Sequence, residues 1–420
     1  MKGILFTCIM VLAALSLVVF ISIQKSLISF YGEKIAVETR VNAMNNFYDS
    51  IINDASKALG IISKRAISTA VGYVIVNGKG LEEANVTIKE LILNGTIDNI
   101  KQLLMENSTF PDWIDKMEQI GAVNGFNTNL TVLDLNVKPY DSFNLFLIVS
   151  LDINITDEHI DATIKRITNV SQLVSIDDFE DPLYPLNTQG RVVNIIVRSP
   201  YWNNFTQKLI ESSGSNGWFY GKSVVINSSN QSGIQSVQDK NQKVLVTDNT
   251  VGIESLANSF GAVVSESDII SGINVAYVDN ANNAMNIIPN NENILVDGNN
   301  GKVWYIENLK IDAEKSYYHP SLNGAGFLDR LEGKLEVQEK YKNLASGIIG
   351  LESFVNKSYI ATYDVPVDYD ETNVDHLYFS SIDYGGSRVK GLSNEFRIDN
   401  ELCTYGISHH SIYNVSEIVY

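Results

Sequence analysis

Residues 4–23 read ILFTCIMVLAALSLVVFISI, a run of twenty residues without charge, proline or glycine. As a helix with a rise of about 1.5 Å per residue, this run would span roughly 30 Å, the thickness of the hydrocarbon core of a bilayer. A cleaved secretory signal has a shorter apolar region and ends at a small-x-small site, whereas this run ends in FISIQK at residues 20–25. The sequence therefore predicts a retained membrane helix in contact with lipid, within an anchor at residues 1–30.

The segment after the anchor has the pattern of an amphipathic helix. Apolar residues recur at steps of three and four, and charged residues fall between them. The apolar positions are Val37, Val41, Met44, Tyr48, Ile51, Ala55, Leu59, Ile62 and Ala66. No proline precedes Pro111, so the anchor and this helix are predicted to form one rod, with Gly32 and Gly60 as its weak points. The apolar stripe fits equally a helix packed on its own domain and a helix bundle between subunits.

The remaining sequence has the patterns of an α+β protein. Helical spacing predicts helices, while alternation or apolar runs beside turn residues predict strands, several of them in hairpins. Helices are expected at residues 97–105, 113–120 and 251–260, and strands at residues 130–138, 143–155, 192–198, 243–247 and on both sides of the turn DGNNG at residues 297–301. The predicted fold class is thus α+β: a transmembrane helix continuing into a long amphipathic helix, then mixed antiparallel sheets and helices in extracytoplasmic domains.

Four domains are expected from these patterns. They are the anchor at residues 1–30, the long helix and helical region at 31–125, a first α+β domain at 126–290 and a mostly β domain at 291–420, with an Asn-rich junction at residues 280–300. The two cysteines, Cys8 in the anchor and Cys403 far from it, are not expected to pair. The net charge of −18 argues against a nucleic-acid partner, because phosphates require basic side chains on the protein.

Asn-x-Ser/Thr triplets are frequent after the anchor. Each is a potential glycan acceptor on a surface loop of an exported domain, although a chain rich in asparagine also contains such triplets by chance. They begin at Asn85, Asn94, Asn107, Asn129, Asn154, Asn169, Asn204, Asn227, Asn230, Asn356 and Asn414. The basic residues beside the anchor, Lys2 on one side and Lys25, Lys34 and Arg40 on the other, do not decide its orientation. The triplets therefore carry the prediction of a single-pass membrane protein whose bulk is extracytoplasmic.

The chain lacks the common sequence motifs of catalysis. It contains no G-x-S-x-G, no G-x-x-x-x-G-K-[ST], no G-x-G-x-x-G and no H-E-x-x-H. None of the five histidines has the spacing of a metal pair on one helix face, so surface or satisfied structural roles are the simpler interpretation for His159, His319, His376, His409 and His410. No catalytic residue is expected, and the chain is predicted not to be an enzyme.

An acidic cluster, VDYDETNVDH at residues 367–376, places several oxygen ligands on a short segment. Asp368, Asp370 and Asp375 are candidate ligands of calcium, which prefers such hard oxygen donors. The cluster lacks the glycine and the closing glutamate of an EF-hand loop, and a solvated charged turn is the simpler interpretation. No other cofactor is expected.

Met1, Lys2 and Gly3 stand directly before the apolar run. A short basic leader that ends in glycine, followed by an apolar and then an amphipathic helix, resembles the N-terminus of type IV pilin-like proteins. The resemblance implies cleavage by prepilin peptidase after Gly3 and packing of the N-terminal helix against other pilin-like subunits. The chain departs from the pattern at the fifth mature position, where Cys8 replaces the glutamate of most pilins.

Further segments resemble a group of archaeal membrane-anchored surface proteins associated with type IV pilus-like systems, whose biochemical role is not established. They are VETRVNAMNNFYDSI in the long helix, FEDPLYPLNTQGRV at residues 179–192, GAGFLDRLEG at 324–333, IIGLESFV at 348–355 and VKGLSNEFRID at 389–399. Within these segments, Arg330 and Arg397 are expected to be buried-edge arginines that pair with Asp329, Glu332 or Asp399.

Three classes of function remain open. The resemblance and the lack of catalytic motifs favour a pilus-associated or cell-envelope structural protein with a glycosylated external domain. A tethered adhesin or solute-binding surface protein without a filament is one alternative, and an envelope enzyme whose site is not visible in one sequence is the other. The direct continuation of the anchor into a long helix is the feature that places the pilin-like role first.

Overall fold

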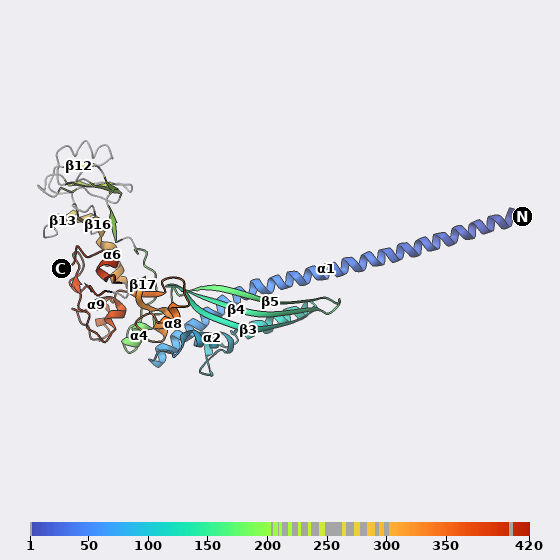
Figure 1. Ribbon diagram of the computed structural model, residues 1–420, viewed down its shortest axis with the longest axis horizontal. Coiled ribbons are helices and arrows are strands. Elements are labelled where there is room, and N and C mark those ends of the chain that lie inside the picture. The colour runs from blue at the N-terminus through green and yellow to red at the C-terminus, as the bar shows by residue number, and fades with distance from the viewer. Residues whose placement is uncertain are drawn as a thin grey trace. The chain divides into compact units, whose positions relative to one another are not determined.

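The computed structural model describes residues 2–202, 306–402 and 406–420, and between residues 203 and 305 only Phe205 and a series of short strands. Its architecture is α+β, with one long N-terminal helix and small sheets that are mainly antiparallel (Figure 1), so this part of the predicted fold class is confirmed. The chain divides into two compact units. Unit 1 comprises Met1–Thr69, Asn85–Val137 and Phe146–Val174, and unit 2 comprises Ala70–Ala84, Lys138–Leu145 and Ser175–Tyr420. The boundaries expected after residues 30 and 125 both lie within unit 1, and the one after residue 290 lies outside the described residues.

Helix α1 runs without interruption from Lys2 to Asn77, through both Gly32 and Gly60 (Figure 1). Within the described part of the chain it is the one helix long and apolar enough to cross a membrane. The predicted stripe is buried from Met44 to Ala66, whereas Val37 is exposed and Val41 half-buried. The buried part of the stripe is therefore packed on its own chain, which favours the first of the two interpretations of the stripe.

The rest of unit 1 surrounds the second half of α1 with a three-stranded sheet and further helices. Tyr48 of α1 hydrogen-bonds Thr168 of the sheet at 2.7 Å, and Trp113 donates to Asp54 of α1 at 2.8 Å. The sheet has the order β3-β4-β5, and β4 alternates strictly between buried and half-exposed residues, as a strand with one covered face does. These elements are α2 (Ala84–Asn94), β1 (Thr96–Ile97), β2 (Ile100–Lys101), η1 (Leu103–Met105), α3 (Phe110–Val123), β3 (Phe126–Asp141), β4 (Asn144–Asp157) and β5 (Thr163–Ser175).

Several predicted elements are confirmed and two are wrong. The hairpin around residues 139–142 is β3 and β4, and residues 113–120 lie in α3. The helix expected at residues 97–105 is instead a small β1–β2 hairpin followed by the single 3-10 turn η1, because Asp98 and Asn99 both have positive φ and form the two-residue turn of the hairpin. The strand expected at residues 192–198 makes only isolated bridges, at Ile195 and Arg198, to two different segments.

Between Phe205 and Ile306, the described residues of unit 2 are short strands. They form two larger sheets, ordered β7-β8-β11-β9 and β13-β14-β15-β16-β6, and the pair β10-β12; all pairings are antiparallel except β9 with β11. The strands are β6 (Thr206–Lys208), β7 (Ile210–Glu211), β8 (Gly217–Tyr220), β9 (Ile226–Asn227), β10 (Ile234–Ser236), β11 (Lys243–Thr247), β12 (Val263–Ser265), β13 (Ile273–Tyr277), β14 (Ala284–Pro289), β15 (Ile294–Asp297) and β16 (Lys302–Tyr305).

The strand expected at residues 243–247 is therefore present as β11, and the hairpin expected around DGNNG is present as β15 and β16. The Asn-rich stretch at residues 280–300, expected to be a loop-rich junction near a domain boundary, contains the strands β14 and β15. The helix expected at residues 251–260 lies outside the described residues.

The C-terminal part of unit 2 consists of short elements around an apolar core. Phe354, Phe396 and Tyr413 meet at its centre, with ring centroids 4.7 to 5.1 Å apart for the two contacts of Phe354. The elements are α4 (Leu183–Asn187), α6 (Ile306–Lys315), β17 (Tyr318–Gly326), α7 (Phe327–Leu331), α8 (Glu339–Lys342), β18 (Gly350–Ser353), α9 (Lys357–Ala361), α10 (Asp375–Tyr378), β19 (Ser387–Arg388), β20 (Arg397–Ile398) and α11 (His409–Ile412).

Candidate metal centre

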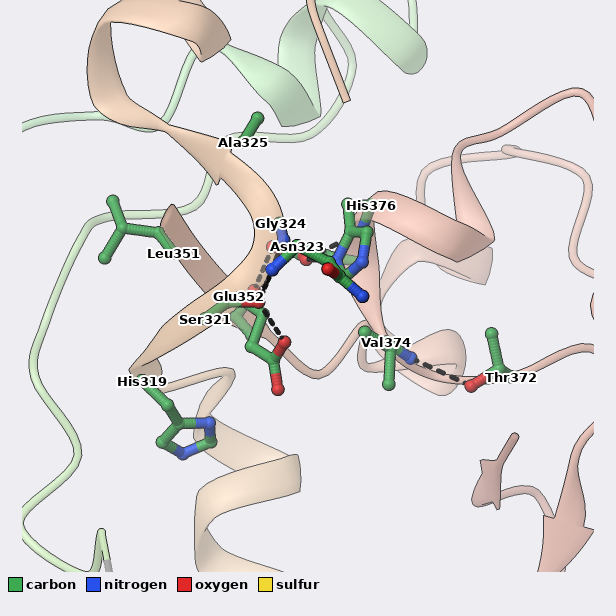
Figure 2. A network of polar contacts seen from close by, with 12 residues as sticks. His319, Ser321, Asn323, Gly324, Ala325, Leu351, Glu352, Thr372, Val374 and His376 are labelled. Carbon is green, nitrogen blue, oxygen red and sulfur yellow. Dashed lines mark hydrogen bonds and ion pairs between the residues drawn. The ribbon is translucent and has the colours of Figure 1, made fainter. Parts of the chain in front are cut away.

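The antiparallel pair β17 and β18 holds a buried carboxylate in the C-terminal part of unit 2. Glu352 of β18 lies opposite His319 of β17, and the Ser321 hydroxyl donates to the Glu352 carboxylate at 2.5 Å (Figure 2). The register shifts between Ser321 and Gly326, and in this irregularity the backbone of Gly324 passes close to its neighbours. A Cβ at Gly324 would lie 2.3 Å from the Leu351 carbonyl oxygen and 3.1 Å from Nδ1 of His376. Only glycine therefore fits there without displacing these groups.

Two histidines from short helices complete a group with Glu352. His376 lies in α10 and His409 in α11, and all three side chains are buried. One potential ligand atom from each residue lies within 4.8 Å of those from the other two. Nε2 of His409 is 3.6 Å from Oε2 of Glu352. Residues distant in sequence are thus brought together with the donor types that bind transition metals.

Some of the ring nitrogens in this group have no hydrogen-bond partner. Both ring nitrogens of His376 and Nε2 of His409 are buried without one. Nδ1 of His376 is 3.4 Å from Oδ1 of Asp375, but the geometry is not that of a hydrogen bond. A buried polar atom without a partner carries the cost of its lost hydration, so this arrangement calls for an explanation.

A shell of hydrogen bonds holds His409 and Glu352 in place. Nδ1 of His409 pairs with Asp399 at 2.8 Å, and the Thr372 hydroxyl donates to the other Asp399 oxygen at 2.9 Å. The Tyr413 hydroxyl donates to Glu352 and also lies 3.1 Å from Nδ1 of His319. The His319 ring in turn contacts Asp312 through its other nitrogen. The carboxylate of Glu352 and the ring of His409 therefore have fixed orientations.

A second buried cluster adjoins this group through Asp375. The Arg330 guanidinium donates to Asp181, to Asp375 at 3.0 Å, and to the carbonyl oxygens of Ala325 and Leu351. Arg330 is buried as expected, but the expected pairing with Asp329 or Glu332 is wrong. The Asp329 carboxylate accepts instead from the backbone N–H groups of Gly326 and Gln338, and Glu332 accepts from Ala84, Lys340 and Tyr341.

Arg397 also differs from the expectation. Its guanidinium pairs with Asp370 at 3.2 Å, whereas the Asp399 carboxylate is engaged by Thr372 and His409. The expected pairing of Arg397 with Asp399 is therefore wrong. Both errors have the same cause: the true partners come from distant segments, and no spacing along the chain reveals them.

Burial and neighbouring charges strongly shift the pKa values of the buried titratable groups. Burial opposes the charged form of His409, but the hydrogen bond to Asp399 and the negative charge of the nearby Glu352 carboxylate outweigh it and raise the pKa of His409 to about 10. Burial likewise opposes ionisation of Glu352, but His409 holds the pKa of that carboxyl well below its usual range. For Asp181, burial dominates and raises the pKa despite the neighbouring Arg330. Without a bound metal, the centre is thus a buried ion pair of His409 with two carboxylates.

A cavity of about 410 Å³ lies beside the two histidines. His376 and His409 form part of its wall, and Asn323, Gln338 and Glu401 line it further. The centre is therefore buried but adjoins a polar space that could hold a small molecule.

The predicted calcium ligands lie in different surroundings. Asp368 and Asp370 are exposed and line another cavity, of about 650 Å³. Asp375 is fully buried and accepts hydrogen bonds from Arg330, Ser353 and its neighbour's backbone. The carboxylate of Asp375 is thus already occupied, and a calcium site that uses all three residues stays a prediction.

The predicted glycan acceptors are distributed over both units. Exposed members are Asn94, Asn107, Asn129, Asn169 and Asn414, and half-buried members are Asn85, Asn154 and Asn356. The side chains of Asn204, Asn227 and Asn230 lie outside the described residues. Gly3, the predicted processing site, lies in the first turn of α1.

The comparisons with known proteins found no similar protein. No protein-family model matches the chain, and no curated protein or solved structure matches it either. The group of Glu352, His376 and His409 was not anticipated from the sequence, where these residues show no ligand spacing. The only hint at that level is the density of acidic residues and histidines in the last part of the chain.

Proposed function

We propose that this chain is a non-enzymatic, membrane-anchored structural protein of the cell surface, associated with a pilus-like assembly. The observation that carries the proposal is helix α1. Its first part is apolar and exposed, and the same unbroken helix becomes part of a folded core from Met44 onward. An exposed apolar helix of this length is stable in a bilayer or against other apolar helices, and not in water.

The exposed apolar surface continues beyond the predicted membrane run. Leu27, Phe30, Tyr31, Ile35 and Val37 are all exposed on α1. In the pilin-like interpretation, other subunits cover these side chains. The exposed Asn-x-Ser/Thr triplets are consistent with an extracytoplasmic, glycosylated domain.

A tethered binding protein is the second candidate. The cavity beside His376 and His409 favours it, because a polar cavity next to buried titratable groups is the usual setting of a ligand site. A protein of a filament can also bind a soluble ligand, so the two candidate functions do not exclude each other. The tethered binding protein requires the anchor and the cavity, but no filament.

The anchor can be tested with charge substitutions in its centre. A Leu12→Arg/Leu15→Arg variant places two charges in the run, each costing about 2.5–3.5 kcal/mol in a bilayer centre. We expect the wild-type protein to remain in membranes at alkaline pH and the double variant to move to the soluble fraction. Ile61→Arg, at an exposed position of α1 outside the run, is the control and should stay with the membrane. Extraction of the wild-type protein by carbonate would contradict the proposal.

The same membrane preparation, analysed by mass spectrometry, separates the candidates. A mature N-terminus at Ile4 supports pilin-like processing after Gly3, and a retained Met1 favours a plain anchor. Glycopeptides at the exposed triplets support the outward orientation. Triplets that are entirely bare, together with protection from external protease, would overturn it.

A further inference from the structure

We propose that Glu352, His376 and His409 bind a zinc ion, or a divalent transition metal of similar preference. The inference is independent of the membrane anchor and of any pilus. It depends on three observations within unit 2: the proximity of three donors, the ring nitrogens without a hydrogen-bond partner, and the hydrogen bonds that orient the ligands.

The donor set selects the class of metal. Two imidazole nitrogens and one carboxylate form a set that zinc uses in sites with three protein ligands. Calcium prefers six to eight oxygen ligands, and this centre offers too few. The distinction from the acidic loop at Asp368 and Asp370 is therefore chemical as well as spatial.

The unpaired nitrogens supply the second, independent observation. The His376 ring is 2% exposed, and neither nitrogen finds a hydrogen-bond partner. Metal coordination satisfies one of these atoms directly. Nε2 of His409 also has no hydrogen-bond partner, although the Glu352 carboxylate lies 3.6 Å from it, and it is the atom that would face the ion.

The surroundings of His409 match those of a metal ligand. Its Nδ1 is engaged by Asp399, and Thr372 orients Asp399 in turn. In metal sites a carboxylate commonly accepts the proton of one ring nitrogen, which directs the lone pair of the other nitrogen to the metal. Asp399 is thus a positioning residue and not a ligand.

The geometry requires a small adjustment. Zinc–ligand distances of about 2.1 Å place tetrahedral ligand atoms roughly 3.4 Å apart. The 3.6 Å between His409 and Glu352 already matches this separation. Because all three ligand atoms lie within 4.8 Å of one another, the His376 ring must approach by at most about 1.4 Å, and no hydrogen bond of its ring nitrogens restrains it.

Charge favours an added cation. Asp181, Asp312, Glu352, Asp375 and Asp399 are all buried. Arg330 supplies a counter-charge to two of them, Asp181 and Asp375. A divalent ion in place of the His409 proton brings additional positive charge to this acidic centre. Because His376 and His409 also line the cavity, the fourth coordination position faces that space and is open to water or a small ligand.

A protonated His409 that pairs with Asp399 and Glu352 is the competing interpretation, and metal titration separates the two. We expect the full-length chain, purified in detergent and stripped with a chelator, to bind one zinc ion in competition with a chromophoric chelator. His376→Ala should weaken binding at least 100-fold, and Asp399→Asn should weaken it 10–100-fold. His410→Gln is the matched control, because the ring of this buried neighbour hydrogen-bonds the Ile398 carbonyl and is not one of the three proposed ligands, and the variant should bind zinc as the wild type does.

Two readouts keep the test independent of the folding of any variant. X-ray absorption of the wild-type zinc complex should show two imidazole nitrogens with additional oxygen ligands. With cobalt as the probe, added azide should shift the visible absorption bands through the open position. Absence of zinc binding, a purely oxygen ligand shell, or equal affinity of the wild type and a folded His376→Ala would each overturn the site, and unchanged bands with azide would overturn the open position.

Discussion

Arg330 is a fully buried cation, and its guanidinium donates hydrogen bonds to buried acceptors. Its guanidinium contacts Asp181, Asp375 and two backbone carbonyls, and the Tyr318 hydroxyl also donates to Asp181 at 2.8 Å. Such a pair adds little net stability over a well-packed apolar core, but removal of one partner leaves uncompensated charge. Removal of Arg330 alone should therefore lower the free energy of unfolding much more than replacement of Arg330 together with its acidic partners by apolar residues.

Substitution of Arg330 by methionine should destabilise unit 2 severely. We expect a loss of about 3–5 kcal/mol in the free energy of unfolding, because Asp181 and Asp375 remain buried without a counter-charge. Asp370→Asn removes the pair with Arg397, in which the Asp370 side chain is 93% exposed, and should cost less than about 1 kcal/mol. Urea unfolding followed by fluorescence measures both. Similar losses for the two variants would contradict the distinction between buried and exposed pairs.

Lys357 should make stability depend on pH in the alkaline range. Burial, helped by the nearby Arg397, lowers the pKa of Lys357 from 10.5 to about 8. Between these values the unfolded chain holds a proton that the folded chain has lost, so the free energy of unfolding rises with pH. The full shift corresponds to roughly 3 kcal/mol, and with allowance for screening we expect about 2 kcal/mol.

Lys357→Met provides the comparison. The variant lacks this titration, so the wild type should gain stability relative to it as the pH rises from 8 to 10.5. Below pH 8 the difference between the two should be constant, because Lys357 is charged in both the folded and the unfolded wild type. Thermal melts at matched pH values measure the difference, and a constant offset across the alkaline window would refute the lowered pKa.

Individual side chains of the centre were the least predictable feature. The sequence identified Arg330 as buried, but not its partners Asp181 and Asp375, which lie on other elements. Glu352, His376 and His409 lie on β18, α10 and α11. Their convergence depends on tertiary packing, and neither periodicity nor spacing along the chain encodes it.

Helix α1 illustrates how one element contains two environments. Leu59 is fully buried, whereas Ile61, two residues away, is 64% exposed. Leu59→Ala should destabilise the protein by about 2–5 kcal/mol, because it removes buried atoms and leaves a cavity. Ile61→Ala should change stability by no more than about 0.5 kcal/mol. Chemical unfolding of both variants tests the packing direction of the helix, and a larger loss for Ile61→Ala would reverse it.

The elements with long, regular patterns were predictable. The apolar run with the stripe gave α1, and alternation around a turn gave β3 and β4. The error at residues 97–105 arose because two positive-φ residues, Asp98 and Asn99, turn a stretch with helical spacing into a hairpin. At residues 192–198 the β-type composition was correct, but no single strand is available as a continuous partner.

Both units of the molecule are assembled from separated segments. Residues 70–84 and 138–145 belong to unit 2, although the segments on either side of them contribute to unit 1. Domain boundaries predicted from the sequence divide the chain into consecutive segments, so they do not predict that segments of the two units alternate along the chain. The α+β class and the N-terminal apolar helix were predictable because they depend on local composition and periodicity.

The exposed stretch of α1 before Arg40 also sets a clearance. The described residues from 24 to 39 are exposed, whereas Arg40 hydrogen-bonds Asp157 of unit 1, and at about 1.5 Å per residue the stretch before Arg40 is roughly 24 Å long. If residues 4–23 occupy a bilayer and the helix stands upright, the first packed layer of unit 1 begins about that far above the lipid. The anchor then acts as a spacer that keeps the packed part of unit 1 away from the membrane surface.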